Sequence, residues 1–386
     1  MITALAVENY RSLRRLVLAV GRLAIVTGPN GSGKSSLYRA LRLLAYAARN
    51  GAVAALAREG GLESAMWAGS PDEGRSMRRG RGRPLVQGGD QHRLLLGFAG
   101  DEFGYAIDLG LPPPAMSMFG SDPEIKAESV WAGPVLRPAA VLAERGASGA
   151  VRIRAAGGGW DRPPGFLEPF DSMLSQAADP QRAPELLVLR ERIQSWRFYD
   201  QLRTDAQAPA RTAQIGTRTP VLSHDGADLA AALQTIREIG DAQALDEAVG
   251  RAFPGSRVEV TAPGGRFELA LRQPGLLRPL RAAELSDGTL RYLLWAAALL
   301  TPRPPEMLVL NEPETSMHPD LIGPLAGLIT AASANTQIIV VTHARPLVTA
   351  FGDSPARVLE LVKENGRTLL AGQGILDEPA WHWPSR

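Results

Sequence analysis

Hydrophobic positions along this chain switch between two spacings, and the switch predicts a mixed α/β fold. Near the N-terminus, short runs of apolar and β-branched residues predict strands at 2–10, 12–20 and 23–27. A glycine-rich loop follows, and then the stretch 34–49 places its leucines on one face of a helix. The chain therefore opens as strand, strand, strand, loop, helix.

The rest of the chain extends this pattern. Strands are predicted within 92–111 and 129–153, with a loop-rich stretch over 51–89 and a connection over 157–184. The later elements are predicted in this order: helices 184–202, 226–240 and 241–253, strands 256–262 and 266–273, a helix from 286, a strand at 306–310, a helix at 320–332, a strand at 336–342 and a final hairpin. No sustained heptad pattern predicts a coiled-coil arm.

The composition of the chain excludes several kinds of site. The 386 residues include no cysteine, which excludes disulfides, thiolate metal sites and a cysteine nucleophile. A net charge of +2 permits nucleic-acid binding without favouring it. The N-terminus lacks the order of a secretory signal, and the longest apolar run, Leu293–Leu300, is too short to span a bilayer. We expect a soluble, cytoplasmic protein with no membrane contact.

The loop after strand 23–27 reads GPNGSGKS, Gly28 to Ser35, and fits the P-loop pattern in full. Between a strand and a helix, such a loop wraps phosphates with backbone N–H groups at the helix N-terminus. Lys34 would reach the β and γ phosphates of a nucleotide, and the Ser35 hydroxyl would ligate Mg²⁺. The alternative is a glycine turn that fits by chance, which the flanking strand and helix disfavour.

Three further features follow late in the chain. The strand MLVL runs out to Asn311 and Glu312, and the strand IIVVT runs out to His343. A carboxylate at the end of a buried strand beside a P-loop can act as general base for an attacking water, which makes Glu312 a candidate. The alternatives are a solvated loop glutamate and a structural histidine. The sequence LSDG at 285–288 is by itself only a helix N-cap.

In this order, the P-loop, LSDG and the strands ending in Glu312 and His343 resemble the motifs of ATP-binding-cassette (ABC) ATPases. The long gap between the first two resembles the RecF/SMC/OLD branch. The segments GGLESAMWAG, WRFYDQLRTDAQAPAR, AELSDGTLRYL and LNEPETSMHPDL are similar to the bacterial "predicted ATPase" group of the AAA_21 type. The resemblance covers nearly the whole chain.

The resemblance implies an α/β P-loop NTPase fold, an ABC/SMC-type ATPase head with a mixed sheet, an antiparallel β lobe and a helical insertion. It also implies three parts. Residues 1–160 would hold the P-loop and the β lobe, and 161–255 would form the mostly helical insertion. Residues 256–386 would carry the signature, Walker B and His-switch motifs.

Roles for single residues follow from the resemblance. Lys34, Glu312 and His343 would be catalytic, as phosphate contact, hydrolytic base and γ-phosphate sensor. Ser286 and Gly288 would contact ATP bound to a second subunit, which implies a head-to-tail homodimer with two ATP molecules between the heads. The implied ATP contacts are Asn30, Gly31, Ser32, Gly33, Lys34, Ser35, Ser36, Arg11, Ser286 and Gly288, and the implied Mg²⁺ ligands are Ser35 and Asn311.

Two positions depart from the family pattern. Asn311 stands where such strands usually end in a magnesium-holding aspartate, and an amide oxygen without charge should weaken the metal site. Because Lys34, Ser35 and Glu312 are intact, we expect slow hydrolysis rather than a nucleotide-binding relic. Glu314 would lie in the dimer-facing loop. No glutamine clearly marks the expected Q-loop, for which Gln87 is the candidate.

Two basic segments allow two interpretations each. In 196–211, Arg197, Arg203 and Arg211 would contact DNA or a partner head; alternatively, Trp196 and Tyr199 pack inward and the charges pair locally. The run RRGRGR, residues 78–83, would follow a phosphate backbone or form a solvated loop.

The function we expect is a Mg-dependent ATPase that acts as a switch on DNA or a DNA-bound complex, in repair or phage defence. The alternative is an ATP-gated regulatory or toxin–antitoxin-type module that binds a protein effector and no DNA.

Overall fold

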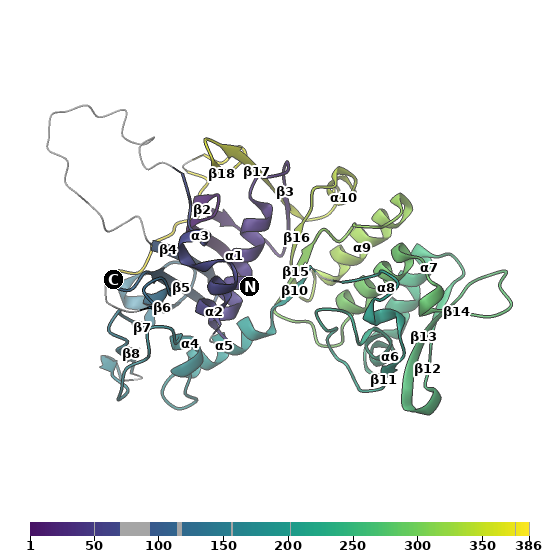
Figure 1. Ribbon diagram of the computed structural model, residues 1–386, viewed down its shortest axis with the longest axis horizontal. Coiled ribbons are helices and arrows are strands. Elements are labelled where there is room, and N and C mark those ends of the chain that lie inside the picture. The colour runs from purple at the N-terminus through teal and green to yellow at the C-terminus, as the bar shows by residue number, and fades with distance from the viewer. Residues whose placement is uncertain are drawn as a thin grey trace. The chain divides into compact units, whose positions relative to one another are not determined.

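The computed structural model describes residues 1–49, 51–69, 93–113, 118–155, 157–200, 202–374 and 376–385. The chain divides into two compact units (Figure 1). Unit 1 comprises Met1–Val20, Gly28–Gln194 and Leu359–Arg386, and unit 2 comprises Gly21–Thr27 and Ser195–Val358.

Unit 1 is built on an antiparallel eight-stranded sheet in the order β2-β1-β4-β5-β6-β7-β8-β9. The strands are β1 Ile2–Tyr10, β2 Leu13–Ala19, β4 Arg93–Gly100, β5 Phe103–Gly110, β6 Glu124–Ala132, β7 Val141–Arg145, β8 Val151–Arg154 and β9 Trp160–Asp161. The inward residues of β4 to β6 are buried almost without interruption, as expected for strands in the middle of a covered sheet.

Helices cover this sheet and a hairpin borders it. The helices are α1 Lys34–Ala47, α2 Ala52–Arg58, α3 Gly61–Ala65, α4 Met173–Gln176 and α5 Pro184–Ser195, with a 3₁₀ turn at Pro138–Ala140. Helix α1 packs on β1 and β4. The hairpin of β17, Arg357–Glu364, and β18, Arg367–Leu370, brings β18 against β2. The stretch predicted as loop-rich, residues 51–89, begins with these two short helices, α2 and α3.

Unit 2 contains a parallel set of strands in the order β10-β15-β16-β3. They are β10 Arg197–Tyr199, β15 Met307–Asn311, β16 Gln337–Val341 and β3 Leu23–Thr27. In this register Asn311 lies opposite Val341, and Val341 lies opposite Val26. The carboxyl ends of β15, β16 and β3 therefore align at one edge of the sheet, where ligands bind in open α/β sheets.

The helices of unit 2 cluster beside these strands (Figure 1). They are α6 Leu229–Ile239, α7 Ala242–Ala252, α8 Asp287–Leu299, α9 Ile322–Ala332 and α10 Arg345–Ala350, with 3₁₀ turns at Pro209–Arg211, Pro263–Gly265, Ala282–Glu284 and Pro319–Leu321. A small antiparallel sheet adds β11 Gln214–Ile215, β12 Arg257–Thr261, β13 Arg266–Arg272 and β14 Leu280–Arg281.

One continuous core joins the strands to the helices. Alternate residues of the strands, such as Ile25, Leu308 and Val340, pack with buried side chains of α8 and α9. Helix α8 is buried almost all round, and Trp295 donates from Nε1 to the Pro313 carbonyl at 2.8 Å. This bond fixes α8 to the loop that follows β15.

One predicted helix was too long. The helix predicted over 184–202 ends at Ser195, and Arg197–Tyr199 form β10, which pairs in parallel with β15. Phe198 and Tyr199 are buried there, so pairing and burial outweigh the local helical pattern.

The α/β fold class is confirmed, because an antiparallel sheet, a set of parallel strands and packed helices are all present. Within the described part of the chain, no helix has both the length and the apolar character needed to cross a bilayer.

Candidate nucleotide-binding and hydrolysis site

The P-loop follows β3 directly and ends in the first turn of α1. Its glycines take backbone angles that other residues rarely adopt, with φ of 142° at Gly28 and 106° at Gly33. Gly33 is the N-cap of α1, and the Lys34 Nζ donates to the carbonyls of Gly28 at 2.7 Å and Pro29 at 3.0 Å. Lys34 thus folds over the loop at the helix N-terminus, which is an anion-binding arrangement.

The β17–β18 hairpin packs against the P-loop. The Thr368 hydroxyl, fully buried, donates to the Ser32 carbonyl at 2.8 Å and also lies 2.8 Å from the Ser12 hydroxyl. A Cβ at Gly28 would meet the Leu361 carbonyl oxygen at 2.1 Å, and one at Gly33 would meet Thr368 Oγ1 at 2.2 Å. Both glycines are therefore required by close packing as well as by backbone angle.

The predicted ATP contacts differ in exposure. Asn30, Gly31 and Ser35 are exposed at the loop and the start of α1, whereas Ser32 and Gly33 are buried and Ser36 is half-buried. An exposed Ser35 hydroxyl beside Lys34 is placed as a phosphate-loop serine must be to reach a metal ion.

Glu312 and His343 come together at the ends of neighbouring strands. Glu312 has a φ of 47°, and its N–H donates to the Val341 carbonyl at 2.7 Å. This left-handed backbone turns the side chain towards His343, whose Nδ1 lies 3.1 Å from Glu312 Oε1. Both side chains are about half exposed, at 42% and 51%. A left-handed glutamate held by the strand edge is the kind of strain found at functional sites.

Glu314 lies in the turn after β15 with its side chain half-buried, and its place at a dimer interface stays a prediction. The buried Thr342 hydroxyl donates to Glu314 Oε1, and the Ala344 N–H donates to the same hydroxyl at 3.0 Å. Glu314 Oε2 is buried and has no hydrogen-bond partner among the described residues. Burial raises the pKa of this carboxyl, and the Thr342 hydrogen bond opposes the rise.

The LSDG segment begins α8. Ser286 is the N-cap, and its Oγ accepts from the Thr289 N–H at 3.2 Å. Gly288 packs closely on the segment after β15, because a Cβ there would lie 3.0 Å from the Ser316 carbonyl oxygen. The Ser286 side chain is exposed. The signature serine is therefore both a helix cap and accessible to a ligand.

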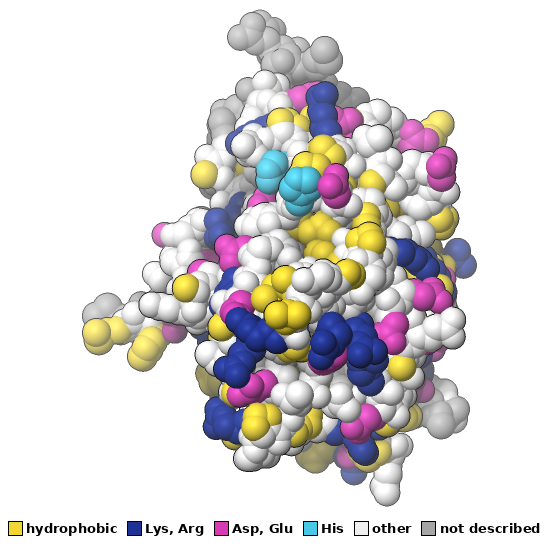
Figure 2. Space-filling model, turned by 90° about the vertical axis from the view of Figure 1, so that its right-hand side faces the viewer, with side chains coloured by type: hydrophobic (Ala, Val, Ile, Leu, Met, Phe, Trp, Pro, Cys, Tyr) yellow, Lys and Arg dark blue, Asp and Glu magenta, His cyan; other side chains and the backbone are white. Residues whose placement is uncertain are grey.

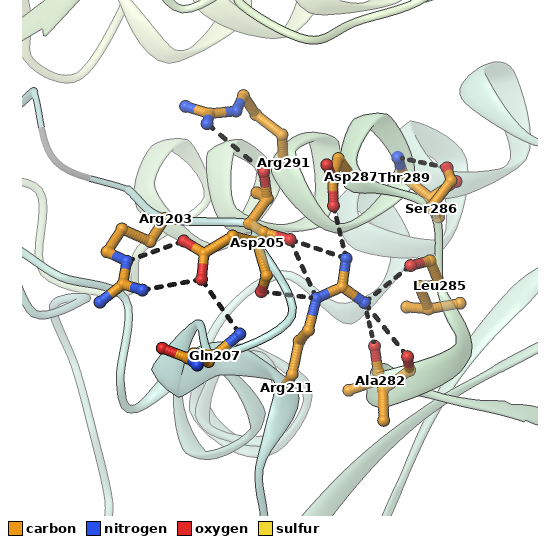
Figure 3. A network of polar contacts seen from close by, with 12 residues as sticks. Arg203, Asp205, Gln207, Arg211, Ala282, Leu285, Ser286, Asp287, Thr289 and Arg291 are labelled. Carbon is orange, nitrogen blue, oxygen red and sulfur yellow. Dashed lines mark hydrogen bonds and ion pairs between the residues drawn. The ribbon is translucent and has the colours of Figure 1, made fainter.

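Arg211 was a candidate surface charge in the sequence, and the structure gives it a different place, in a buried network of hydrogen bonds. Figure 3 shows its guanidinium between the segment at Thr204–Asp205 and the segment that leads into α8. Its side chain is only 8% exposed, so it is not the surface charge that one interpretation of segment 196–211 required. The inward-packing alternative describes this segment: Trp196 and Tyr199 are buried, and Arg203 pairs with Asp205 at 2.7 Å.

Other candidate residues are placed as follows. Arg11, at a φ of 50°, pairs with Glu59 at 2.6 Å, and its contact with nucleotide stays a prediction. Asn311 is half-buried at the end of β15. Gln87 and the run 78–83 lie outside the described residues.

The chain is similar to solved structures and matches one family model. The fold is similar to the crystal structure of an SMC head bound to the C-winged helix domain of ScpA, with a TM-score of 0.51 and 13% identity over 97% of this chain and 98% of the other. The chain also matches an SMC head of Thermotoga maritima, with a TM-score of 0.44 and 14% identity over 97% of this chain and 99% of the other. It matches an SMC head of Pyrococcus furiosus bound to the C-terminal domain of ScpA as well, with a TM-score of 0.48 and 12% identity over 96% of this chain and 95% of the other.

The fold is therefore similar to that of an SMC head. The family model described as "AAA domain, putative AbiEii toxin, Type IV TA system" matches residues 23–103 and 161–350, more than half of the chain. The chain belongs to this family, AAA_21, which confirms the resemblance seen in the sequence. No curated protein matches it.

Proposed function

We propose that this chain is a Mg-dependent, slow ATPase whose heads dimerise around ATP. The observation that carries the proposal is the Glu312–His343 pair, 3.1 Å apart at the ends of β15 and β16. Strand β3 lies next to β16 in register and leads directly into the P-loop. In the proposed reaction the P-loop holds the phosphates of ATP and the pair acts on the γ-phosphate.

In this site Glu312 accepts a proton from the water that attacks the γ-phosphate. The hydrogen bond between His343 Nδ1 and Glu312 Oε1 orients the carboxylate, and the imidazole would contact the γ-phosphate. Lys34 neutralises charge on the β and γ phosphates.

The donor set for Mg²⁺ fits the ion only weakly. Ser35 and Asn311 offer neutral oxygens at the α1 N-terminus and the β15 end. Mg²⁺ prefers carboxylate, phosphate and water oxygens, so its binding here depends on the phosphates of ATP. When bound, the ion would neutralise charge on the β and γ phosphates. Slow hydrolysis follows from this donor set.

The dimer is proposed from the signature segment. The exposed Ser286 hydroxyl and the N–H groups at the start of α8 would contact the γ-phosphate of ATP held by a second copy. ATP would then close a head-to-tail homodimer, and hydrolysis would reopen it.

We place this switch in the cytoplasm, acting on DNA or a DNA-bound complex in repair or phage defence. On the face in Figure 2, Lys and Arg side chains gather with acidic ones among them. The second candidate is an ATP-gated regulatory or toxin–antitoxin-type module that binds a protein effector and no DNA, and the description of the AAA_21 family favours it.

The first test is the molar mass in solution of the wild type and Glu312→Gln, with and without Mg-ATP. We expect Glu312→Gln to slow hydrolysis by about 10²-fold or more and to trap the dimer, because the base is lost while the phosphate contacts remain. Ser286→Arg should abolish the dimer, since the longer cation fills the contact. A protein that stays monomeric at every ATP concentration would refute the switch.

A second measurement separates the two candidates. Retention of DNA that requires ATP and falls steeply with salt would favour the DNA switch. No retention at low salt, under conditions in which Glu312→Gln forms a dimer, would exclude it and favour the protein-binding module.

A further inference from the structure

Arg211 makes an unusual number of contacts for one side chain. Its Nε donates to the carbonyls of Thr204 at 2.9 Å and Asp205 at 3.0 Å. Its Nη1 donates to the carbonyls of Ala282 at 3.0 Å, Ala283 at 3.3 Å and Leu285 at 2.7 Å, and its Nη2 donates to the Thr204 carbonyl at 2.7 Å and to Asp287 Oδ1 at 2.6 Å.

These acceptors lie in two segments that are distant in sequence. One segment follows β10, the strand that pairs with β15. The other is the 3₁₀ turn Ala282–Glu284 and the start of α8, which carries Ser286 (Figure 3). Since guanidinium has five N–H donors in a fixed plane, it can hold both segments at one angle, whereas a lysine ammonium has three donors at one point.

We infer that Arg211 is the residue that positions the signature segment for ATP bound to a second subunit. It fixes the carbonyls immediately before Ser286 and the carboxylate immediately after it, so the cap hydroxyl faces solvent in one orientation. Through Thr204 and β10, it also ties this segment to the strand that ends at Asn311. This inference rests on the proposed dimer.

The test compares Arg211→Lys and Arg211→Ala in the Glu312→Gln background. Both variants should bind ATP as monomers with about the parent affinity, because no P-loop residue changes. Their Mg-ATP-dependent dimer should dissociate at about tenfold higher protein concentration or more, since several charged hydrogen bonds are lost. Arg203→Ala is the matched control, because Arg203 lies in the same segment and pairs with Asp205, and the dimer of this variant should be unchanged.

Chemical rescue tests positioning directly. Free guanidinium ions at low millimolar concentration should partly restore the Arg211→Ala dimer, whereas the same concentration of sodium chloride should not. A general loss of folding would not respond in this way. If Arg211→Ala does not fold, Arg211→Lys carries the comparison.

The outcomes separate the two claims. If Ser286→Arg still dimerises with ATP, the proposed sandwich itself is wrong. If Ser286→Arg blocks the dimer while Arg211→Lys, and Arg211→Ala where it folds, dimerise like the parent, the positioning role of Arg211 is wrong and the proposed function stands.

A different observation carries a second inference, in the β lobe of unit 1. A cavity of about 970 Å³ lies between the β7–β9 strands and the C-terminal segment, which returns to this lobe (Figure 1). Trp160 lines it, with the guanidinium carbons of Arg152 and Arg154 at 4.6 Å and 4.4 Å from its ring centre. Trp383 lines the C-terminal side and donates to Glu8 at 2.8 Å.

The cavity has an excess of positive charge. Of its lining arginines, Arg152 pairs with Glu144, and Arg145 pairs with the buried Glu128 at 3.5 Å. Arg137 and Arg154 also line it, and neither has an acidic partner among the described residues. Besides its contact with Trp160, Arg154 donates to the Pro138 carbonyl at 3.4 Å. No residue of the P-loop lines this cavity.

The geometry points to a site for a nucleotide unit, with its phosphate on Arg137 and Arg154 and its base against the aromatic residues. Guanidinium groups bind phosphate through paired hydrogen bonds, and bases stack on aromatic side chains. The unit could belong to a free nucleotide or to single-stranded nucleic acid, which share this chemistry.

The test uses Lys34→Ala, which disables the P-loop, with AMP and an oligothymidylate as probes. We expect binding that weakens by about tenfold or more in the added Arg137→Ala/Arg154→Ala double variant, with a salt slope reduced by about 0.7 per lost phosphate contact for the oligonucleotide. Arg182→Ala, an exposed arginine outside the cavity, should change nothing.

Tighter binding of the oligonucleotide than of AMP would identify nucleic acid as the source, and equal binding would identify a free nucleotide. Absence of binding by both probes, or equal binding by the double variant, would overturn the site.

Discussion

Asn311 ends β15 at the position beside Glu312, the base in the proposed reaction, and its side chain is neutral. A carboxylate there would attract Mg²⁺ and its bound water by charge, whereas an amide offers only a dipole. Glu314 cannot simply replace it, because its Oε1 accepts from the buried Thr342 hydroxyl. At the residue scale, the rate of the proposed reaction therefore depends on how well ATP itself supplies charge to the ion.

Asn311→Asp should strengthen the metal site. We expect the Mg²⁺ concentration at half-maximal hydrolysis to fall by on the order of tenfold, because one full charge replaces a dipole next to the ion. Steady-state hydrolysis measured across a Mg²⁺ series checks this, with Asn311→Ala as the control that removes the oxygen. An unchanged Mg²⁺ dependence in the aspartate variant would show that this position does not face the ion.

Glu314→Gln should change stability in a pH-dependent way. Burial raises the pKa of Glu314, so the folded protein binds this proton more tightly than the unfolded chain does. That stability is present below the unfolded pKa and is lost as pH rises through the raised folded pKa. Glutamine cannot ionise, so the variant should gain stability relative to wild type as the pH rises above the pKa of an unfolded glutamate, about 4.3.

Thermal or denaturant unfolding of both proteins across this range measures the difference. A stability difference that stays constant with pH would mean that Glu314 titrates alike in the folded and unfolded chain.

At the scale of elements, motifs within one short run of residues could be predicted from the sequence, whereas contacts between distant segments could not. The P-loop and the strands ending in Glu312 and His343 were predicted because each lies in one short run of residues. Strand β10 was missed because three residues become a strand only through their pairing with β15. The contacts of Arg211 were missed because its acceptors at Ala282–Asp287 are brought near it only by folding.

The first turn of α8 gives a prediction that separates its two roles. Ser286→Ala removes the cap and should lower the free energy of unfolding by about 1 kcal/mol. Ser286→Asp keeps an N-cap acceptor and should retain stability, yet its charge would repel the γ-phosphate of the second subunit's ATP. Unfolding curves and the ATP-dependent molar mass of both variants are the measurements. An aspartate variant that is stable and still dimerises would leave Ser286 as a cap alone.

At the scale of the whole molecule, ATP binding and the proposed dimer formation depend on different contacts. The P-loop contacts come from one copy, and the proposed signature contacts come from another. A ligand that binds only the folded state stabilises it by about 2.7 kcal/mol at a concentration one hundred times its dissociation constant, whatever the protein concentration. Stabilisation through a dimer instead grows with the concentration of protein.

Mg-ATP should therefore raise the melting temperature of Glu312→Gln in two parts, which a protein dilution series resolves. The part that persists at the lowest protein concentration reports binding to one head, and the part that grows with protein concentration reports the dimer. Lys34→Ala should lose both parts, because it removes the phosphate contact, whereas Ser286→Asp should lose only the second. A shift of equal size at every protein concentration would mean that ATP stabilises each head alone, and the head-to-tail sandwich would then be wrong.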